Sequence, residues 1–173
     1  MTAVVHRSYL YAPAHKQRLV EKAYASEADA VVLDLEDAVP LGSKNEARAA
    51  AAGILASTPP KPTYVRVNAP TSGLCQDDIQ AVAGPGLAAV RLPKVDRPEH
   101  IRDAAAWLAE AGSQAGVQIL VESALGVEAL SQLATASPPQ LGTEQAEGLR
   151  QAIRGLGSGR TVGEVLREAA VPE

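Results

Sequence analysis

Three carboxylates lie in and directly after a short apolar run near the start of the chain. The run is Val31-Val-Leu-Asp-Leu35, and the acids are Asp34, Glu36 and Asp37. An uninterrupted apolar run of this length is typical of a parallel strand that is buried on both faces. Several carboxylates at the end of a buried strand cost free energy unless a cation, a hydrogen-bond donor or water contacts them. Any one of them could simply solvate a loop, but the three together predict a site.

Polar side chains also follow the later apolar segments of the chain. Arg66 and Asn68 end one segment, Lys94 follows another, and Glu122 follows a third. In α/β folds, ligands bind at the carboxyl ends of the strands, and in barrels these ends carry the catalytic residues. The repeated placement is therefore a stronger signal than any single residue in it.

The elements that must position these side chains alternate between strand and helix patterns. Strands are expected at 7–11, 30–35, 63–67, 87–92 and 117–121. Helices are expected at 15–24, 43–56, 77–82, 98–115 and 125–133. The spacing of Ser43 and Glu46 predicts a capping box at the start of the second helix. This order predicts an α/β fold with a parallel sheet and right-handed crossovers.

The alternation stops after about residue 137. We expect residues 1–137 to form one α/β domain and residues 138–173 to form a helical segment with helices at 143–153 and 161–169. A glycine-rich stretch, Gly155-Leu-Gly-Ser-Gly159, joins these two helices. Because it follows a helix and not a strand, it reads as a linker or hinge and not as a dinucleotide-binding loop.

The composition narrows the function classes. Lys and Arg number 16 and Asp and Glu 20, and the net charge of −4 argues against a nucleic-acid surface and a polybasic membrane anchor. The single Cys75 cannot form an intrachain disulfide and reads as a packing residue, which fits a reducing cytoplasm. No apolar run approaches the ~20 residues of a membrane helix. His6, His15 and His100 show no metal-binding spacing and are expected at the surface.

Five motifs, in this order, resemble a known family. They are similar to the citrate lyase beta subunit-like branch of the HpcH/HpaI aldolase superfamily, which includes malyl-CoA and citramalyl-CoA lyases. The resemblance covers roughly residues 7–134. The motifs are Arg7-Ser-Tyr-Leu-Tyr-Ala-Pro13, Asp34-Leu-Glu-Asp-Ala-Val39, Val65-Arg-Val-Asn68, Leu92-Pro-Lys-Val95 and Val121-Glu-Ser-Ala-Leu-Gly126.

The resemblance implies a TIM barrel, a Mg²⁺ cofactor and retro-aldol cleavage of a 3-hydroxyacyl-CoA of the citryl-, malyl- or citramalyl-CoA type. It implies that Arg66 binds the carboxylate or keto acid, a task that suits the planar guanidinium fork. Glu122 would be a metal ligand that also meets the substrate, and Glu36 and Asp37 would hold metal-bound waters. Lys16 and Arg18 would contact the CoA.

Structural alternatives remain open for three of these residues. Arg66 could form a salt bridge to one of the strand-end acids. Glu122 could be a solvated residue at a helix start, where the helix dipole favours it. Lys94 could pair with Glu36 or Asp37.

The chain departs from the family pattern at its end. A closed barrel needs eight strands and typically about 250 residues, whereas five strand–helix units are expected here. The resemblance implies a second metal-binding carboxylate on the next strand, but Pro138-Pro-Gln-Leu-Gly-Thr-Glu144 offers neither a buried strand nor the expected Asp. Glu144 could substitute for it, although it lies in the first turn of an expected helix. We therefore expect an incomplete, C-terminally shortened barrel whose open face is covered by the terminal helices or in a homo-oligomer. The alternative to a lyase is a weakly active or inactive relative that binds CoA or a protein partner.

Overall fold

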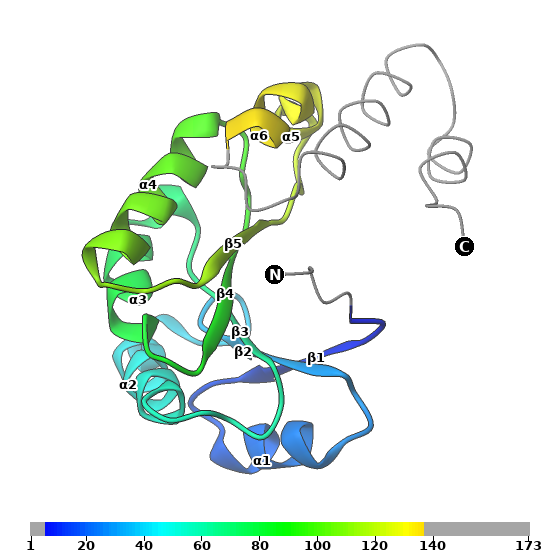
Figure 1. Ribbon diagram of the computed structural model, residues 1–173, viewed down its shortest axis with the longest axis vertical. Helices are drawn as coiled ribbons and strands as arrows, with labels where there is room; N and C mark the ends of the chain where they lie inside the picture. Colours follow the sequence, from blue (N-terminus) through cyan, green and yellow to red (C-terminus); the bar gives the residue numbers. More distant parts are fainter. Residues whose placement is uncertain (1–5, 137–173) are drawn as a thin grey trace.

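The computed structural model describes residues 6–136 of the chain (Figure 1). Five parallel strands form one sheet in sequential order. The strands are β1 (Tyr9–Pro13), β2 (Ala30–Asp34), β3 (Thr63–Arg66), β4 (Leu87–Leu92) and β5 (Gly116–Ile119). This arrangement confirms the predicted α/β fold with five strand–helix units. Over residues 6–136 the sheet does not close, and β1 and β5 are its edges.

The helices lie along the convex side of the curved sheet, and the concave side faces away from them (Figure 1). In chain order they are α1 (Gln17–Ala25), α2 (Lys44–Leu55), α3 (Cys75–Val82), α4 (Pro98–Glu110), α5 (Ala124–Glu128) and α6 (Leu130–Ala136). Two short 3-10 helices, η1 (Leu41–Ser43) and η2 (Pro70–Ser72), precede α2 and α3. None of the helices in the described part of the chain is both long and apolar enough to cross a membrane.

Alternation along the strands separates two clusters of buried side chains. Val31 and Leu33 of β2 pack in the main core with residues of the helices. Ala30 and Val32 belong to a smaller cluster on the concave face, which also contains Tyr64 and Ala89. All five residues of β2 are buried, as its uninterrupted apolar sequence predicts.

Several predicted boundaries are wrong. The first strand lies at Tyr9–Pro13 and not at 7–11, because its residues pair one to one with Ala30–Asp34 of β2. Helix α4 ends at Glu110, before the expected residue 115. Gly112 adopts a φ of 73°, and the N–H of Ser113 bonds to the carbonyl of Leu108. This left-handed turn ends the helix.

The helix expected over 125–133 is divided into α5 and α6. The helices expected at 143–153 and 161–169 lie outside the described residues.

Three local predictions can also be judged. The predicted capping box is wrong, because Ser43 ends a 3-10 turn and its side chain makes no capping hydrogen bond. The prediction that His100 lies at the surface is wrong, since it is 7% exposed and its ring lies beside Asp96 and Arg97. Cys75 is confirmed as a packing residue. Burial raises the pKa of its thiol to about 12, so it carries no thiolate at neutral pH.

Candidate active site at the strand carboxyl ends

An arginine–carboxylate fork joins the ends of β2 and β3. Asp34 and Arg66 are register partners on these neighbouring strands. Arg66 Nε donates to Asp34 Oδ1 at 2.8 Å, and Nη2 donates to Oδ2 at 2.5 Å. Two parallel hydrogen bonds of this kind fix the plane of the guanidinium group. The salt bridge left open by the sequence therefore exists, and it orients Arg66 at the carboxyl end of β3.

The buried Asp34 is ionised in this arrangement. Burial to 1% exposure would raise the pKa of the carboxyl, but hydrogen bonds from Arg66 and from the backbone N–H groups of Glu36 and Ala38 outweigh it. The pKa of Asp34 therefore lies below its ordinary value. The bond to Asp34 in turn raises the pKa of Arg66 further above its usual range. The pair is therefore a carboxylate and a guanidinium cation at neutral pH.

Glu36 and Asp37 both lie near Nη1 of the same guanidinium group. Arg66 Nη1 lies 3.5 Å from Glu36 Oε2 and 3.9 Å from Asp37 Oδ2. Lys94 Nζ lies 2.8 Å from Glu36 Oε1 and 3.6 Å from Asp37 Oδ1. Glu36 is 5% exposed, yet neither of its oxygens has a hydrogen-bond partner of good geometry among the described residues. The short Lys94 contact is therefore ionic attraction, and Glu36 keeps unused acceptor capacity in a buried position.

Lys94 links these acids to Glu122. Its backbone N–H donates to Glu122 Oε2 at 3.2 Å, and its ammonium group faces Glu36, which raises the pKa of Lys94. Lys94 has a φ of 54°, and among the described residues no other non-glycine residue has a positive φ. Such a conformation is strained for a residue with a Cβ atom and is often found at functional sites. The strained turn aims the backbone N–H at Glu122 while the side chain reaches Glu36.

The strain at Lys94 gives a testable prediction. Lys94→Gly is expected to be more stable than Lys94→Ala by about 1 kcal/mol, because only glycine adopts this φ without a steric cost. Both variants lose the ammonium group, so the difference between them isolates the backbone. Urea unfolding of the two proteins measures it. Equal stabilities would show that the positive φ at Lys94 carries no strain.

The ends of four strands thus bring together one group of charged side chains, which we call the strand-end cluster. Four carboxylates meet two cations in it, so two negative charges are in excess. Lys44 approaches the cluster, but its ammonium group donates to the carbonyls of Leu35 and Glu36, at 2.6 Å each, and not to a carboxylate. The members of the cluster are Asp34, Glu36, Asp37, Arg66, Lys94 and Glu122.

Other residues expected at the site are placed differently. Lys16, the N-cap of α1, and Arg18, in the first turn of α1, are both exposed. Asn68 does not join the strand-end cluster. Its backbone and side-chain N–H groups donate to the buried Asp78, at 2.9 and 2.6 Å.

The sequence interpretation missed Lys44, which holds the backbone around Glu36, and Arg91. Arg91 is the register partner of Arg66 on β4 and lies on the same face of the sheet. The apolar residues around it read only as a strand. Nothing in one sequence distinguishes Lys44 from a solvated lysine at a helix start.

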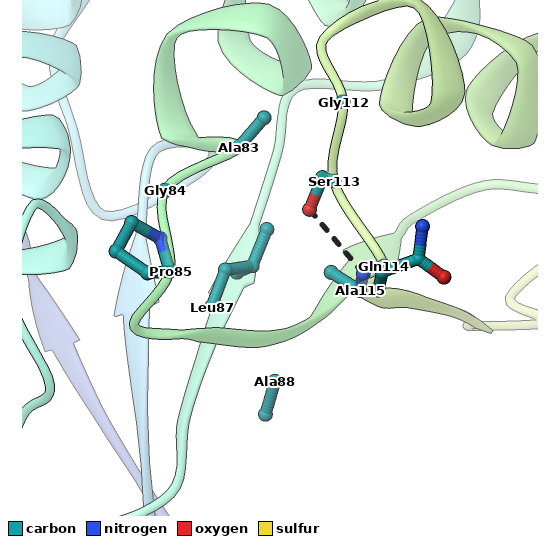
Figure 2. Close-up of a pocket in the computed structure, with 9 residues that line it drawn as sticks. All are labelled: Ala83, Gly84, Pro85, Leu87, Ala88, Gly112, Ser113, Gln114 and Ala115. Atoms are coloured by element: carbon teal, nitrogen blue, oxygen red, sulfur yellow. Dashed lines mark hydrogen bonds between the residues drawn. The ribbon is translucent and has the colours of Figure 1, made fainter.

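A hollow of about 420 Å³ lies at the opposite end of the sheet (Figure 2). The segments before β4 and before β5 line it with small side chains, and the Ala115 N–H donates to Ser113 Oγ at 3.2 Å across the second of these segments. Its lining includes Gly84, Pro85, Leu87, Gly112 and Gln114 and no titratable side chain. It therefore offers no group for acid–base or metal chemistry, and the strand-end cluster remains the candidate site.

The family model of HpcH/HpaI aldolase/citrate lyase matches residues 7–144, which include the five strands of the described part of the chain and the whole strand-end cluster. The chain belongs to this family. A citrate lyase subunit beta-like protein of Deinococcus radiodurans is 36% identical over 127 residues, which cover 70% of this chain and 44% of the relative. The mitochondrial citramalyl-CoA lyase of Homo sapiens is 33% identical over 111 residues, or 62% of this chain and 32% of the relative. The chain thus spans less than half the length of these two relatives.

A solved structure of a relative supports the fold. It is the protein CitE from Mycobacterium tuberculosis in complex with magnesium, acetoacetate and coenzyme A. It matches with a TM-score of 0.64 and 31% identity, over 78% of this chain and 47% of that one. The similarity to this family, which the motifs indicated, is confirmed.

Proposed function

We propose that the protein is a Mg²⁺-dependent carbon–carbon lyase that cleaves a 3-hydroxyacyl-CoA of the citryl-, malyl- or citramalyl-CoA type by a retro-aldol reaction. Membership of a family that contains citrate lyase and citramalyl-CoA lyase supports this proposal. The magnesium and coenzyme A bound to the related CitE structure support the cofactor and the substrate class. The observation in this chain that carries the proposal is the charge pattern of the strand-end cluster.

That pattern fits a divalent cation. Glu122 is exposed, and one of its oxygens accepts from Lys94 N. Glu36 has ion-pair contacts with Lys94 and Arg66, but among residues 6–136 its two buried oxygens have no hydrogen-bond partner. Among residues 6–136 no three His, Cys, Asp or Glu side chains are grouped as a complete metal cage. Mg²⁺ needs no such cage, because it keeps several waters and binds through one or two carboxylates. Glu122 would hold the ion, and Glu36 and Asp37 would accept hydrogen bonds from its waters.

The side chains of the cluster have distinct tasks in this reaction. Arg66, fixed by Asp34, would bind and orient the carboxylate of the acid that is released. Lys94 limits the repulsion between Glu36 and Asp37 and holds one oxygen of Glu122 through its backbone. When bound, Mg²⁺ supplies the positive charge that stabilises the enolate developing on the thioester. Lys16 and Arg18, exposed beyond the end of β1, would meet the phosphates of CoA.

Calorimetry with Mg²⁺, with and without a short acyl-CoA plus keto acid, tests the proposal. The wild type is expected to bind the ion, and Glu122→Ala is expected to lose binding by at least about tenfold, because one carboxylate carries much of the interaction. Glu128→Ala removes an exposed acid from α5 and serves as the matched control. If the wild type binds no Mg²⁺ at millimolar concentration, even with ligand present, the proposed lyase function is wrong.

One observation favours a second candidate. The described residues offer a single carboxylate, Glu122, as a direct ligand, so a protein that binds CoA or a protein partner without cleaving a substrate also fits. Lyase assays on malyl- and citramalyl-CoA separate the two, since only the first function releases a keto acid. The homo-oligomer and the cytoplasmic location expected from the sequence stay predictions.

A further inference from the structure

Two side-chain cations share the same two carboxylates of the strand-end cluster. Glu36 Oε2 and Asp37 Oδ2 face Nη1 of Arg66, at 3.5 and 3.9 Å. The other oxygen of each acid, Glu36 Oε1 and Asp37 Oδ1, faces the ammonium group of Lys94, at 2.8 and 3.6 Å. Each acid thus divides its two oxygens between two cations of the protein.

The two cations are held very differently. The Arg66 side chain is 17% exposed, and two hydrogen bonds to Asp34 fix it. The Lys94 side chain is 54% exposed, and among the described residues its ammonium group has no ion-pair partner except Glu36 and Asp37. An exposed ammonium group can turn into water at little cost, whereas a displaced Arg66 would leave the buried Asp34 without its partner. If a further cation enters the cluster, Lys94 is therefore the group that gives way.

The backbone of Lys94 is anchored independently of its side chain. Its N–H donates to Glu122 Oε2 at 3.2 Å. The next residue, Val95, is fully buried, and its N–H donates to the carbonyl of Leu120 at 3.3 Å. These contacts belong to the main chain and do not involve the ammonium group. Lys94 therefore combines a fixed contact to Glu122 with a movable charge.

A magnesium ion held by Glu122 would need the oxygens that the ammonium group contacts. Mg²⁺ keeps several waters, and nearby carboxylates orient these waters by accepting their hydrogen bonds. In the proposed function the acceptors are Glu36 and Asp37. A divalent ion also repels an ammonium group in the same cluster, and this repulsion is stronger where water is partly excluded. Lys94 therefore opposes the ion both by its charge and by its contacts with the acceptors.

We propose that Lys94 is an internal competitor of Mg²⁺, whose ammonium group neutralises Glu36 and Asp37 until the waters of a bound ion replace it, and which thereby lowers the affinity of the protein for the ion. This inference rests on the proposed function, because it concerns the regulation of the same metal site. Without the ammonium group, the four carboxylates of the cluster would face Arg66 alone, with three negative charges in excess instead of two. A more negative cluster attracts a divalent cation more strongly.

Calorimetry with Mg²⁺ alone, on the full chain, tests the proposal. Lys94→Met removes the charge and keeps the length of the side chain, and Lys94→Arg keeps the charge. Lys22→Met removes an exposed lysine from α1 and is the matched control. Lys94→Gly removes the ammonium group and relieves the positive φ, so it serves as a second variant if Lys94→Met does not fold.

Lys94→Met and Lys94→Gly are expected to bind Mg²⁺ about 10-fold more tightly than the wild type, because the charge that competes for the same acids is gone. Lys94→Arg should stay within about threefold of the wild type, because the positive charge remains. Lys22→Met should leave the affinity unchanged. Urea unfolding gives an independent readout, since the same concentration of Mg²⁺ should stabilise Lys94→Met more than the wild type.

Each outcome decides between the possible roles of Lys94. A wild type that binds Mg²⁺ as tightly as Lys94→Met, or more tightly, would show that Lys94 only supports Glu36 and Glu122, and the inference would be wrong while the lyase proposal stands. The inference is also wrong if Lys94→Arg gains as much affinity as Lys94→Met, because the charge is then not the cause. If none of the proteins binds Mg²⁺ at millimolar concentration, even with a short acyl-CoA plus keto acid, the proposed function is wrong and the inference fails with it.

Discussion

Replacing Arg66 by methionine is expected to lower the free energy of unfolding by about 3–5 kcal/mol, which is the usual cost of leaving a buried charge without its partner. The side chain of Asp34 is 1% exposed and that of Glu36 is 6% exposed, so neither carboxylate can recover the lost interaction from water. The same substitution should abolish binding of the keto acid, because it removes the group that orients the carboxylate. Urea unfolding and calorimetry measure the two effects.

Two further variants make the Arg66 result interpretable. Arg66→Lys keeps the charge but loses the two-bond fork to Asp34, so we expect a smaller loss of stability and a large loss of acid binding. Arg102→Met removes an exposed arginine and should change the stability by less than about 0.5 kcal/mol. A loss below about 1 kcal/mol in Arg66→Met would mean that the buried acids do not depend on the guanidinium group.

The second large effect is expected away from the cluster, at Asp78 of α3. Asp78 is 1% exposed and accepts three hydrogen bonds, from Arg48 Nε at 2.8 Å and from the backbone and side chain of Asn68 at 2.9 and 2.6 Å. It therefore ties α2 and α3 to the end of β3. Asp78→Ala leaves Arg48 and Asn68 without their acceptor, and we expect a loss of about 3–5 kcal/mol in unfolding free energy.

The neighbouring Asp77 provides a matched control. Its side chain is 66% exposed and lies 3.8 Å from Arg48 Nη1. Asp77→Ala removes the same chemical group from the same helix, but a surface ion pair contributes little, so a loss of less than about 1 kcal/mol is expected. Similar losses in the two variants, measured by urea unfolding, would contradict the distinct structural role that we assign to Asp78.

The predictions at Arg66 and Asp78 both concern the carboxyl end of β3. Arg66 is the last residue of β3, and Asn68 lies two residues beyond it. Asp78 therefore fixes the segment that directly follows Arg66. If Asp78→Ala still folds, its acid binding should be weakened more than that of Asp77→Ala, because the end of β3 has lost its anchor.

The sequence alone determined the alternation of elements and the face on which the chemistry lies. The apolar run at Val31–Leu35 predicted a strand buried on both faces, and β2 is buried throughout, because the helices cover one face and Tyr64 and Ala89 pack on the other. The segment Leu87–Leu92 was predicted to the residue, since glycines and prolines bound it on both sides. The acids and bases at the strand ends were also recognised, because parallel strands must bring their carboxyl ends to one edge of the sheet.

The tertiary structure alone decided which of these charges are partners. Arg66 meets Asp34 across 32 residues, and Arg48 meets Asp78 across 30, and no local pattern encodes such pairs. Lys44 and Arg91 were missed for the same reason, because their importance lies in what they contact. Helix α4 ends earlier than predicted because Gly112 adopts a positive φ, a backbone angle that the periodicity of the sequence does not show. Periodicity is a local property that a sequence displays, whereas the pairing of distant charges depends on register and strand order, which are set only when the sheet forms.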